Sequence, residues 1–447
     1  MSLIEQAMPN GVCARLETRY PVTYPLLESA TYTSLVNFVS SKKYPVHRWY
    51  FYREGFSPEL VNTLLGSFEL NGGGLILDPF CGGGTTLLVA RARNLPSVGF
   101  ETNPFSAFLS KVKVVSYSPV DIDALLGHVA TMEKLSFTPT LKPPKLSFIG
   151  RLFEQRILQR LLMFKEYINS VQCSLHRDFL KLGWLATLEP LSNYRKAGNG
   201  LKLKRPSRRV ENRLSWFDVK PITDGLLFAQ YQIMLNDLMS LIHEEVMSKP
   251  QPSVYEESAL LMDRYLDLES VSGVVFSPPY ANCFDYTEIY KIELWMGDFI
   301  SDYEDLVPLR RKAIRSHLHG VCRKNSNKAD CLQESASIVQ SIRESNPHSL
   351  RIPEMVEGYF DDMFQVLDIL LQLLRKGGSC AIVVSNSSYG GIIIPTDLLL
   401  SRYAEEIGFE VKSINVARFI ITSSQQYART KPWRKYLRES IVLLEKK

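Results

Sequence analysis

The chain has 447 residues, of which 45% are hydrophobic and 22% charged, and its formal net charge is +5 at pH 7. This composition is typical of a globular protein with one large domain or two, and it excludes fibrous, collagen-like and disordered proteins. The seven cysteines form no C-x-x-C pair, and no apolar run approaches the ~18 residues of a membrane span. We therefore expect a soluble cytoplasmic protein with reduced thiols and no signal peptide, membrane span or metal site.

The first predicted elements form a βαβ unit between residues 75 and 101. A buried strand at 75–77 leads into a glycine-rich turn at 78–84, a helix at 85–93 and a second strand at 97–100, which ends in Glu101. In such a unit the acid after the second strand binds a ribose hydroxyl, which indicates an adenosine-containing cofactor. Leu87 stands at the last position of the dinucleotide pattern G-x-G-x-x-G, so a pyrophosphate is not required.

The rest of the chain reads as a helical region followed by further strands and helices. Residues 118–224 are predicted to be mostly helical. The elements predicted after them are a helix at 225–247, strands at 260–262 and 273–276, a helix at 287–295, an irregular basic segment at 301–353, an amphipathic helix at 357–374 that ends at a glycine pair, a strand at 380–384, a helix at 396–407 stopped by Gly408, and an antiparallel edge pair at 410–416 and 440–444.

Strand 273–276 is followed by Ser277-Pro278-Pro279-Tyr280. Two adjacent prolines lack backbone N–H groups and have a fixed φ, so this segment is a stiff loop at the carboxyl end of a buried strand. Ligands of open α/β sheets bind at such strand ends, and a hydroxyl beside an aromatic ring suits a flat ligand. Asn282, Asp285 and Tyr286 fit a pocket floor or ordinary packing equally well, and His317 and His319 are interpreted as surface residues without a role.

Basic residues are concentrated near residues 195–213, 310–324 and 429–438 of this nearly neutral chain. A solvated surface would explain any one of these clusters, but three local excesses favour contacts with phosphates. The residues assigned to these contacts are Arg195, Lys196, Lys202, Lys204, Arg205, Arg208, Arg209, Arg310, Arg311, Lys312 and Arg315.

Five short stretches together resemble the motifs of amino-group DNA methyltransferases. Residues 78–86 resemble the first cofactor motif, 99–104 the second and 262–264 the third, while 277–280 resemble the catalytic motif and 53–60 the N-terminal motif. The sequence departs from the family pattern where Gly83 replaces the usual Ser or Thr. The cofactor motif also precedes the catalytic motif here, whereas many N4-cytosine enzymes have the opposite order.

The resemblance implies S-adenosylmethionine as cofactor and assigns roles to individual residues. The implied cofactor-binding residues are Asp78, Phe80, Gly82, Gly83, Gly84, Thr85, Glu101, Asn103, Asp263, Phe56 and Ser57, with Asp263 at the adenine amino group and Phe56 and Ser57 near the methionine end. The implied catalytic residues are Ser277, Pro278, Pro279 and Tyr280. The Ser277 hydroxyl and the Pro278 carbonyl would accept hydrogen bonds from the target amino group, and Tyr280 would stack on the base.

The resemblance also implies a fold and a division of the chain. We expect an α/β, Rossmann-like class I methyltransferase sheet of seven strands, mostly parallel, with the last strand antiparallel. The expected regions are an N-terminal extension (1–44), a methyltransferase domain (45–117 and 256–447), a helical insertion for DNA contact or target recognition (118–255) and a second basic insertion (301–353).

The expected function is methylation of the N4 amino group of cytosine in flipped-out duplex DNA, because the serine form of the catalytic motif is most common among such enzymes. A restriction–modification system with a cognate endonuclease is the expected setting. N6-adenine methylation is the nearest rival, since the same loop serves both amino groups. An RNA methyltransferase or a catalytically silent DNA-binding protein would also fit these motifs, whereas C5 methylation lacks the Pro-Cys dipeptide it needs.

Overall fold

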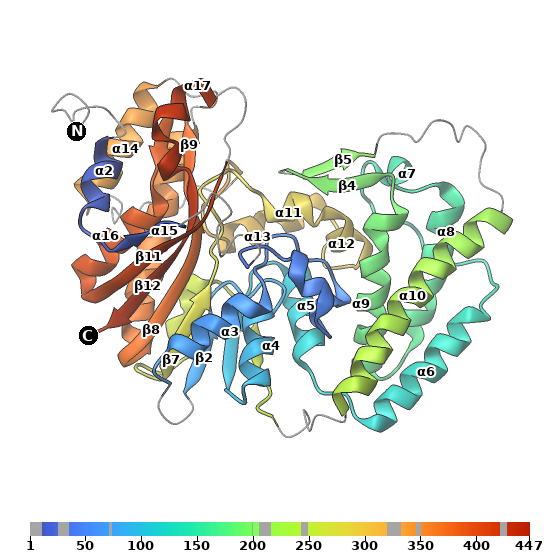
Figure 1. Ribbon diagram of the computed structural model, residues 1–447. Coiled ribbons are helices and arrows are strands. Elements are labelled where there is room, and N and C mark those ends of the chain that lie inside the picture. Colours follow the sequence, from blue (N-terminus) through green and yellow to red (C-terminus); the bar gives the residue numbers. More distant parts are fainter. Residues whose placement is uncertain are drawn as a thin grey trace.

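The computed structural model describes residues 11–25, 35–70, 74–198, 200–204, 216–242, 249–319, 332–345, 349, 351–420 and 427–447. Among these residues the main sheet has eight strands in the order β1-β11-β12-β8-β7-β2-β3-β6 (Figure 1). The strands are β1 (Val22–Thr23), β2 (Leu75–Asp78), β3 (Ser97–Phe100), β6 (Ser253–Tyr255), β7 (Val271–Phe276), β8 (Leu374–Ser385), β11 (Phe409–Phe419) and β12 (Arg438–Lys446).

The pairing of the strands confirms the predicted fold class. β12 runs antiparallel to both of its neighbours, β11 and β8, while the other pairs of the sheet are parallel. The sheet has one strand more than predicted, because Val22 and Thr23 of the N-terminal segment pair with Ile414 and Asn415 at the edge. The predicted antiparallel pair of β11 and β12 is therefore present, and β1 pairs with β11 at the edge of the sheet.

Helices cover both faces of the sheet, which explains why its central strands are apolar on both sides. The helices α3 (Pro58–Ser67) and α4 (Thr85–Ala92) lie on one face, and α15 (Arg351–Leu373) and α16 (Thr396–Ile407) lie on the other (Figure 1). Neighbouring residues of β7 point in opposite directions, so Val275 packs in the core under α3 while Val274 and Phe276 pack in the core under α15. Gly408 ends α16 as predicted, with a φ of +118° that favours glycine.

A helical body with its own apolar core stands beside the sheet (Figure 1). Its elements are α5 (Pro104–Val114), α6 (Pro119–Glu133), α7 (Ile149–Leu152), α8 (Gln155–Ser170), α9 (Ser174–Leu191), α10 (Trp216–Ile242) and the hairpin of β4 (Tyr194–Ala197) and β5 (Gly200–Leu203). The start of α6 shows why this region folds as helices, because Ser118 and Asp121 form a capping box around Pro119 at the first helical position.

The prediction of a strand at 260–262 is wrong. The strand next to β3 is β6, and residues 259–264 form the 3₁₀ helix η4 (Ala259–Arg264), which starts where the Ser258 hydroxyl accepts the Leu260 N–H. Leu260 and Met262 are apolar because they enter the core from this turn, and a run of three apolar residues does not distinguish a buried turn from a strand.

The segment predicted to be irregular at 301–353 contains several helices among its described residues, while residues 313–319 lie outside helices and strands. The elements among the described residues from 286 to 351 are α11 (Tyr286–Ile289), α12 (Lys291–Met296), η5 (Tyr303–Asp305), α13 (Leu306–Lys312), α14 (Gln333–Glu344) and the start of α15. The predicted glycine pair after α15 lies inside β8 instead, where Gly377 has a φ of +71° and the register with β7 shifts. The helix therefore passes directly into the strand at Leu374.

Short elements complete the described part of the chain. They are α2 (Gly11–Glu17), η1 (Val39–Lys43), η2 (His47–Trp49), β9 (Ser387–Tyr389), β10 (Ile392–Ile394), α17 (Tyr427–Thr430) and η7 (Lys431–Tyr436). No helix among the described residues is both long enough and apolar enough to span a membrane.

A buried ion pair joins the hairpin of β4 and β5 to the helix α12. Lys196 of β4 is 2% exposed, and its Nζ lies 2.7 Å from Glu293 Oε1 of α12 and 2.6 Å from the Tyr50 hydroxyl. The same ammonium lies 4.3 Å from the centre of the Tyr290 ring. The assignment of Lys196 to phosphate contacts is therefore wrong, because its charge is enclosed and already paired.

We expect Lys196→Met to lower the free energy of unfolding by about 3–5 kcal/mol, because Glu293 would stay buried without its cation. The double variant Lys196→Met/Glu293→Leu should recover most of this loss, since no charge remains buried. Arg195→Met is the matched control on the exposed face of the same strand and should stay within about 0.5 kcal/mol of the unmodified protein. Urea unfolding measures all three, and equal stability of Lys196→Met and Arg195→Met would contradict the internal role.

Candidate active site

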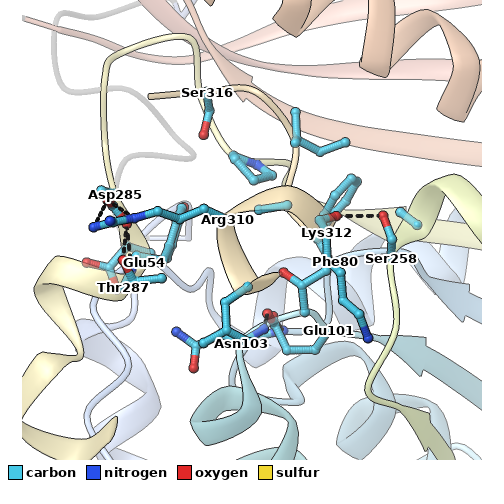
Figure 2. A pocket seen from close by; sticks show the side chains of 18 of the residues that line it. Glu54, Phe80, Glu101, Asn103, Ser258, Asp285, Thr287, Arg310, Lys312 and Ser316 are labelled. Carbon is cyan, nitrogen blue, oxygen red and sulfur yellow. Dashed lines mark hydrogen bonds and ion pairs between the residues drawn. The ribbon is translucent and has the colours of Figure 1, made fainter. Parts of the chain in front are cut away.

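The carboxyl ends of β2, β3, β6 and β7 surround one pocket of about 820 Å³, part of which is open to solvent. Pockets of this size hold small organic ligands, and this sheet edge is where open α/β folds bind them. The lining residues are Tyr52, Glu54, Pro79, Phe80, Gly82, Glu101, Thr102, Asn103, Glu257, Ser258, Ala259, Ser277, Pro279, Asp285, Tyr286, Thr287, Leu309, Arg310, Lys312, Ala313, Ile314, Ser316 and His317. Figure 2 shows Glu101, Phe80 and Asn103 on one side of the pocket and Arg310 across it.

The glycine turn is shaped by close contact with Tyr52. A Cβ atom on Gly82, whose φ is +46°, would lie 2.9 Å from Tyr52 Cε1, and one on Gly83 would lie 3.1 Å from Tyr52 Cβ. The Tyr52 ring in turn stacks on Tyr290, with 5.1 Å between the ring centres. The departure from the family pattern at Gly83 therefore has a physical reason, since the side chain of Tyr52 occupies the adjoining space.

Glu101 is held at the pocket wall by backbone N–H groups. Its Oε2 accepts from Gly82 N at 3.1 Å and its Oε1 accepts from Asn103 N at 2.7 Å. Burial raises the pKa of Glu101 to about 7, against the opposing effect of these N–H groups. The carboxyl group therefore changes its charge near neutral pH.

Two further predicted cofactor residues lie next to Glu101. Burial raises the pKa of Asp78 to about 7, and its Oδ1 accepts from Phe80 N at 3.0 Å, so it shapes the turn from behind the pocket wall. Asn103 lines the pocket and caps α5 with its Oδ1, while its buried Nδ2 has no hydrogen-bond partner among the described residues. An unpaired buried donor beside a carboxylate fits a polar ligand such as a nucleoside.

The structure brings together only part of the predicted cofactor set. Gly84 starts α4 with a φ of +78°, and Thr85 is 5% exposed inside the first turn; neither lines the pocket. Phe56 packs in the core under α3, and Ser57 uses its hydroxyl to accept the Leu60 N–H. Tyr52 and Glu54, a few residues earlier in the chain, line the pocket in place of Phe56 and Ser57.

Asp263 does not lie in the pocket and is exposed on η4. The strand whose end was expected to carry it is β6, which stops at Tyr255, so the lining residues at this position are Glu257 and Ser258. Figure 2 shows Ser258, whose hydroxyl donates to the Lys312 carbonyl at 2.8 Å. The assignment of Asp263 to the adenine amino group is therefore wrong, because its side chain lies outside the pocket.

The proline loop reaches the pocket from the end of β7. Ser277 and Pro279 line it, Pro278 is buried, and Tyr280 stands behind them. The Ser277 hydroxyl lies 3.2 Å from the Tyr280 hydroxyl, which donates to Glu439 Oε1 at 2.7 Å. Burial raises the pKa of Tyr280 well above its ordinary value, so its phenol stays protonated at neutral pH.

Asp285 and Arg310 close the pocket on the side opposite Glu101 (Figure 2). Arg310 Nε donates to Asp285 Oδ2 at 3.0 Å, and Thr287 N donates to Asp285 Oδ1 at 2.9 Å. Burial alone would raise the pKa of Asp285, but His317, Thr287 and Arg310 together lower it below its ordinary value. Of the two interpretations of Asp285 and Tyr286, the structure therefore supports the pocket wall.

His317 is buried and lines the pocket, so its interpretation as a surface residue is wrong, whereas His319 is exposed as expected. Asp285 Oδ2 lies 3.8 Å from His317 Nδ1 and 4.0 Å from His319 Nδ1, a separation that a metal ion can bridge. A cation there would have to displace Arg310 from the same carboxylate oxygen. We therefore assign no metal to this cluster.

The predicted phosphate-binding residues divide into exposed and internally paired ones. Arg195, Lys202 and Arg311 are exposed, and Lys312 is exposed beside Glu257. Arg310 pairs with Asp285 as described above, Lys204 donates to three carbonyls near the end of α9, and Arg315 is 8% exposed and bonded to Asp362. The assignments of Lys204, Arg310 and Arg315 to phosphates are corrected accordingly. Arg205, Arg208 and Arg209 lie outside the described residues.

The geometry of the pocket agrees with comparisons to known proteins. Residues 38–110, which include the glycine turn and Glu101, match the N6/N4 methyltransferase family model, described as DNA methylase. The chain is 30% identical over 486 residues to the Type II methyltransferase M.BsoBI of Geobacillus stearothermophilus, which covers 99% of this chain and 93% of that protein.

Two further relatives show the same relationship. The Type II methyltransferase M.AvaI of Anabaena variabilis is 28% identical over 470 residues, 96% of this chain and 92% of that protein. The Type II methyltransferase M.MvaI of Kocuria varians is 23% identical over 344 residues, 73% of each chain. Because the likeness extends over nearly the whole length of both this chain and M.BsoBI, and because a family model also matches, the chain belongs to the family of amino-group DNA methyltransferases.

Proposed function

We propose that this protein transfers the methyl group of S-adenosylmethionine to the N4 amino group of cytosine in duplex DNA. The observation that supports the proposal is that Ser277, which follows β7, and Glu101, which follows β3, line the same pocket. S-adenosylmethionine supplies an electrophilic methyl carbon on a sulfonium when it is bound. The family as a whole supports this cofactor.

The pocket residues fit an adenosine group in the cofactor. Glu101 offers carboxylate oxygens to ribose hydroxyls, and the Phe80 ring and Ala259 offer apolar surface for a purine. Asn103 Nδ2 is a donor without a partner in the described part of the chain, and Glu257, which lines the pocket, would accept from the adenine amino group in place of Asp263. Tyr52 and Glu54 would then face the methionine end.

The proline loop would prepare the target amine for attack. The nitrogen lone pair of an exocyclic amino group is delocalised into the ring, which makes it a poor nucleophile. Hydrogen bonds from its two N–H groups to the Ser277 hydroxyl and the Pro278 carbonyl would localise the lone pair toward the methyl carbon. The prolines keep this carbonyl fixed, and holding both reactants in line can contribute about 7–11 kcal/mol. Stacking of Tyr280 on the base stays a prediction, because Tyr280 stands behind Ser277 and Pro279 and does not line the pocket.

DNA contact is proposed for the exposed basic residues alone. Arg195 and Lys202 face each other across the hairpin of β4 and β5. Like charges at paired positions repel, and a phosphate between them would remove this repulsion. Flipping the base costs a few kcal/mol of unstacking, which such contacts can offset. The Type II names of the relatives support a modification role beside a restriction endonuclease.

The methylated nucleoside in the product identifies the amino group that the protein methylates. Unmodified plasmid DNA incubated with the purified protein and S-adenosylmethionine, then digested to nucleosides, should yield N4-methylcytosine by mass spectrometry. If N6-methyladenine forms instead, the proposed mechanism stands and the target base is adenine. If neither forms on DNA from several unmodified sources while the cofactor binds, the DNA assignment is wrong and RNA becomes the substrate to test.

We expect Ser277→Ala to lower kcat by about a hundredfold or more, because one acceptor for the target amine is lost. Single-turnover methylation with tritiated S-adenosylmethionine measures this effect. The affinity for the cofactor should stay within about twofold, since Ser277 contacts the amine and not the ribose. Full turnover by Ser277→Ala would exclude the proposed chemistry, whereas a silent DNA-binding protein would show no turnover in either form.

Cofactor affinity should fall below neutral pH. An acid with a raised pKa is protonated below that value, and protonated Glu101 loses an acceptor for the ribose hydroxyls. With a pKa of about 7, the dissociation constant at pH 6 should be about tenfold that at pH 8. Calorimetric titration measures it, and Glu101→Gln should bind more weakly with a flat pH profile. If the dissociation constant of Glu101→Gln still rises from pH 8 to pH 6, the group that titrates is Asp78 instead.

A further inference from the structure

A chain of hydrogen bonds connects the catalytic loop with the last strand of the sheet. The Ser277 and Tyr280 hydroxyl oxygens are 3.2 Å apart, and the Tyr280 hydroxyl lies 2.7 Å from Glu439 Oε1. Glu439 stands near the start of β12, is 2% exposed and pairs through its other oxygen with Arg418 of β11. No family motif in the sequence includes Glu439 or Arg418.

The carboxylate sets the direction of every hydrogen in this chain. An ionised carboxylate has only acceptors, so the Tyr280 hydrogen must point to Glu439. The phenol oxygen is then left with lone pairs facing Ser277, and it accepts the Ser277 hydrogen. As a result the Ser277 hydroxyl offers only its lone pairs on the pocket side.

A serine by itself does not have a fixed role, because its hydroxyl can donate as well as accept. The target amine brings two N–H donors, so it needs acceptors only. We propose that Glu439 is a positioning residue, which acts through Tyr280 to hold the Ser277 hydroxyl as an acceptor for the target amine. This inference rests on the proposed function of Ser277.

The charge of Glu439 also matches the reaction. Positive charge develops on the amine nitrogen as the methyl carbon approaches, and an acceptor polarised by a carboxylate is a stronger partner for its N–H. The effect is larger in the transition state than with bound substrate, so it should appear in kcat rather than in binding.

The test is a double-mutant cycle of Tyr280→Phe and Glu439→Gln. Tyr280→Phe removes only the hydroxyl and keeps the ring, so it tests the chain even if a change at Glu439 affects folding. Tyr280 and Arg418 use different oxygens of Glu439, and Glu439→Gln replaces one of these oxygens with an NH2 donor, so one of the two residues loses its acceptor. Glu445→Gln is the matched control, because Glu445 lies on the same strand and pairs at the surface with Lys412 at 3.4 Å.

Each single variant should lower kcat by about tenfold or more, with KM for DNA and the dissociation constant for the cofactor within about twofold. The double variant should be no slower than the slower single variant, because both changes interrupt the same series of hydrogen bonds from Ser277 to Glu439. Glu445→Gln should keep the unmodified rate, and thermal unfolding of each variant shows whether the fold is retained.

Three outcomes would overturn the inference. One is full kcat in Tyr280→Phe, another is a double variant whose losses multiply, and the third is a loss that appears in cofactor affinity alone. If these occur while Ser277→Ala is inactive, the proposed function stands and only the role of Glu439 falls. If Ser277→Ala is fully active, both fall together.

Discussion

Parallel pairing of four neighbouring strands is the constraint on which the site depends. β6, β3, β2 and β7 run in the same direction, so their carboxyl ends meet at one edge of the sheet. Residues far apart in the chain thereby line one pocket, and Gly82, Glu101, Glu257 and Ser277 each follow a different strand. Helices on both faces bury the sheet and keep these ends in place.

Antiparallel insertion of β12 adds a second constraint. By lying between β11 and β8, this strand brings Glu439 beside a loop that is more than a hundred residues earlier in the chain. A parallel strand at that place would reverse the order of its residues along the sheet and carry Glu439 toward the other edge. The strand that distinguishes this sheet from a fully parallel one therefore also reaches the catalytic loop.

Several charged residues serve the fold rather than a ligand. Lys196 of β4 pairs with Glu293 of α12, Arg315 pairs with Asp362, and fully buried Arg438 pairs with Asp397. A buried cation needs such a partner because its charge is costly to remove from water. The partners lie 41 to 97 residues away in the chain. A cluster of basic residues in the sequence therefore does not show which of their side chains are exposed.

The sequence alone determined the fold class, the glycine turn, the strand ends at Glu101 and Ser277, and the family, because these depend on patterns within a few residues of each other. Only the tertiary structure decided that Tyr52, Glu54, Glu257 and His317 line the pocket while Asp263, Phe56 and Ser57 do not. It also decided which basic residues are exposed and that Glu439 touches Tyr280. The physical reason is that side-chain neighbours depend on strand order and on where each strand stops, and a short apolar run or a charge cluster specifies neither.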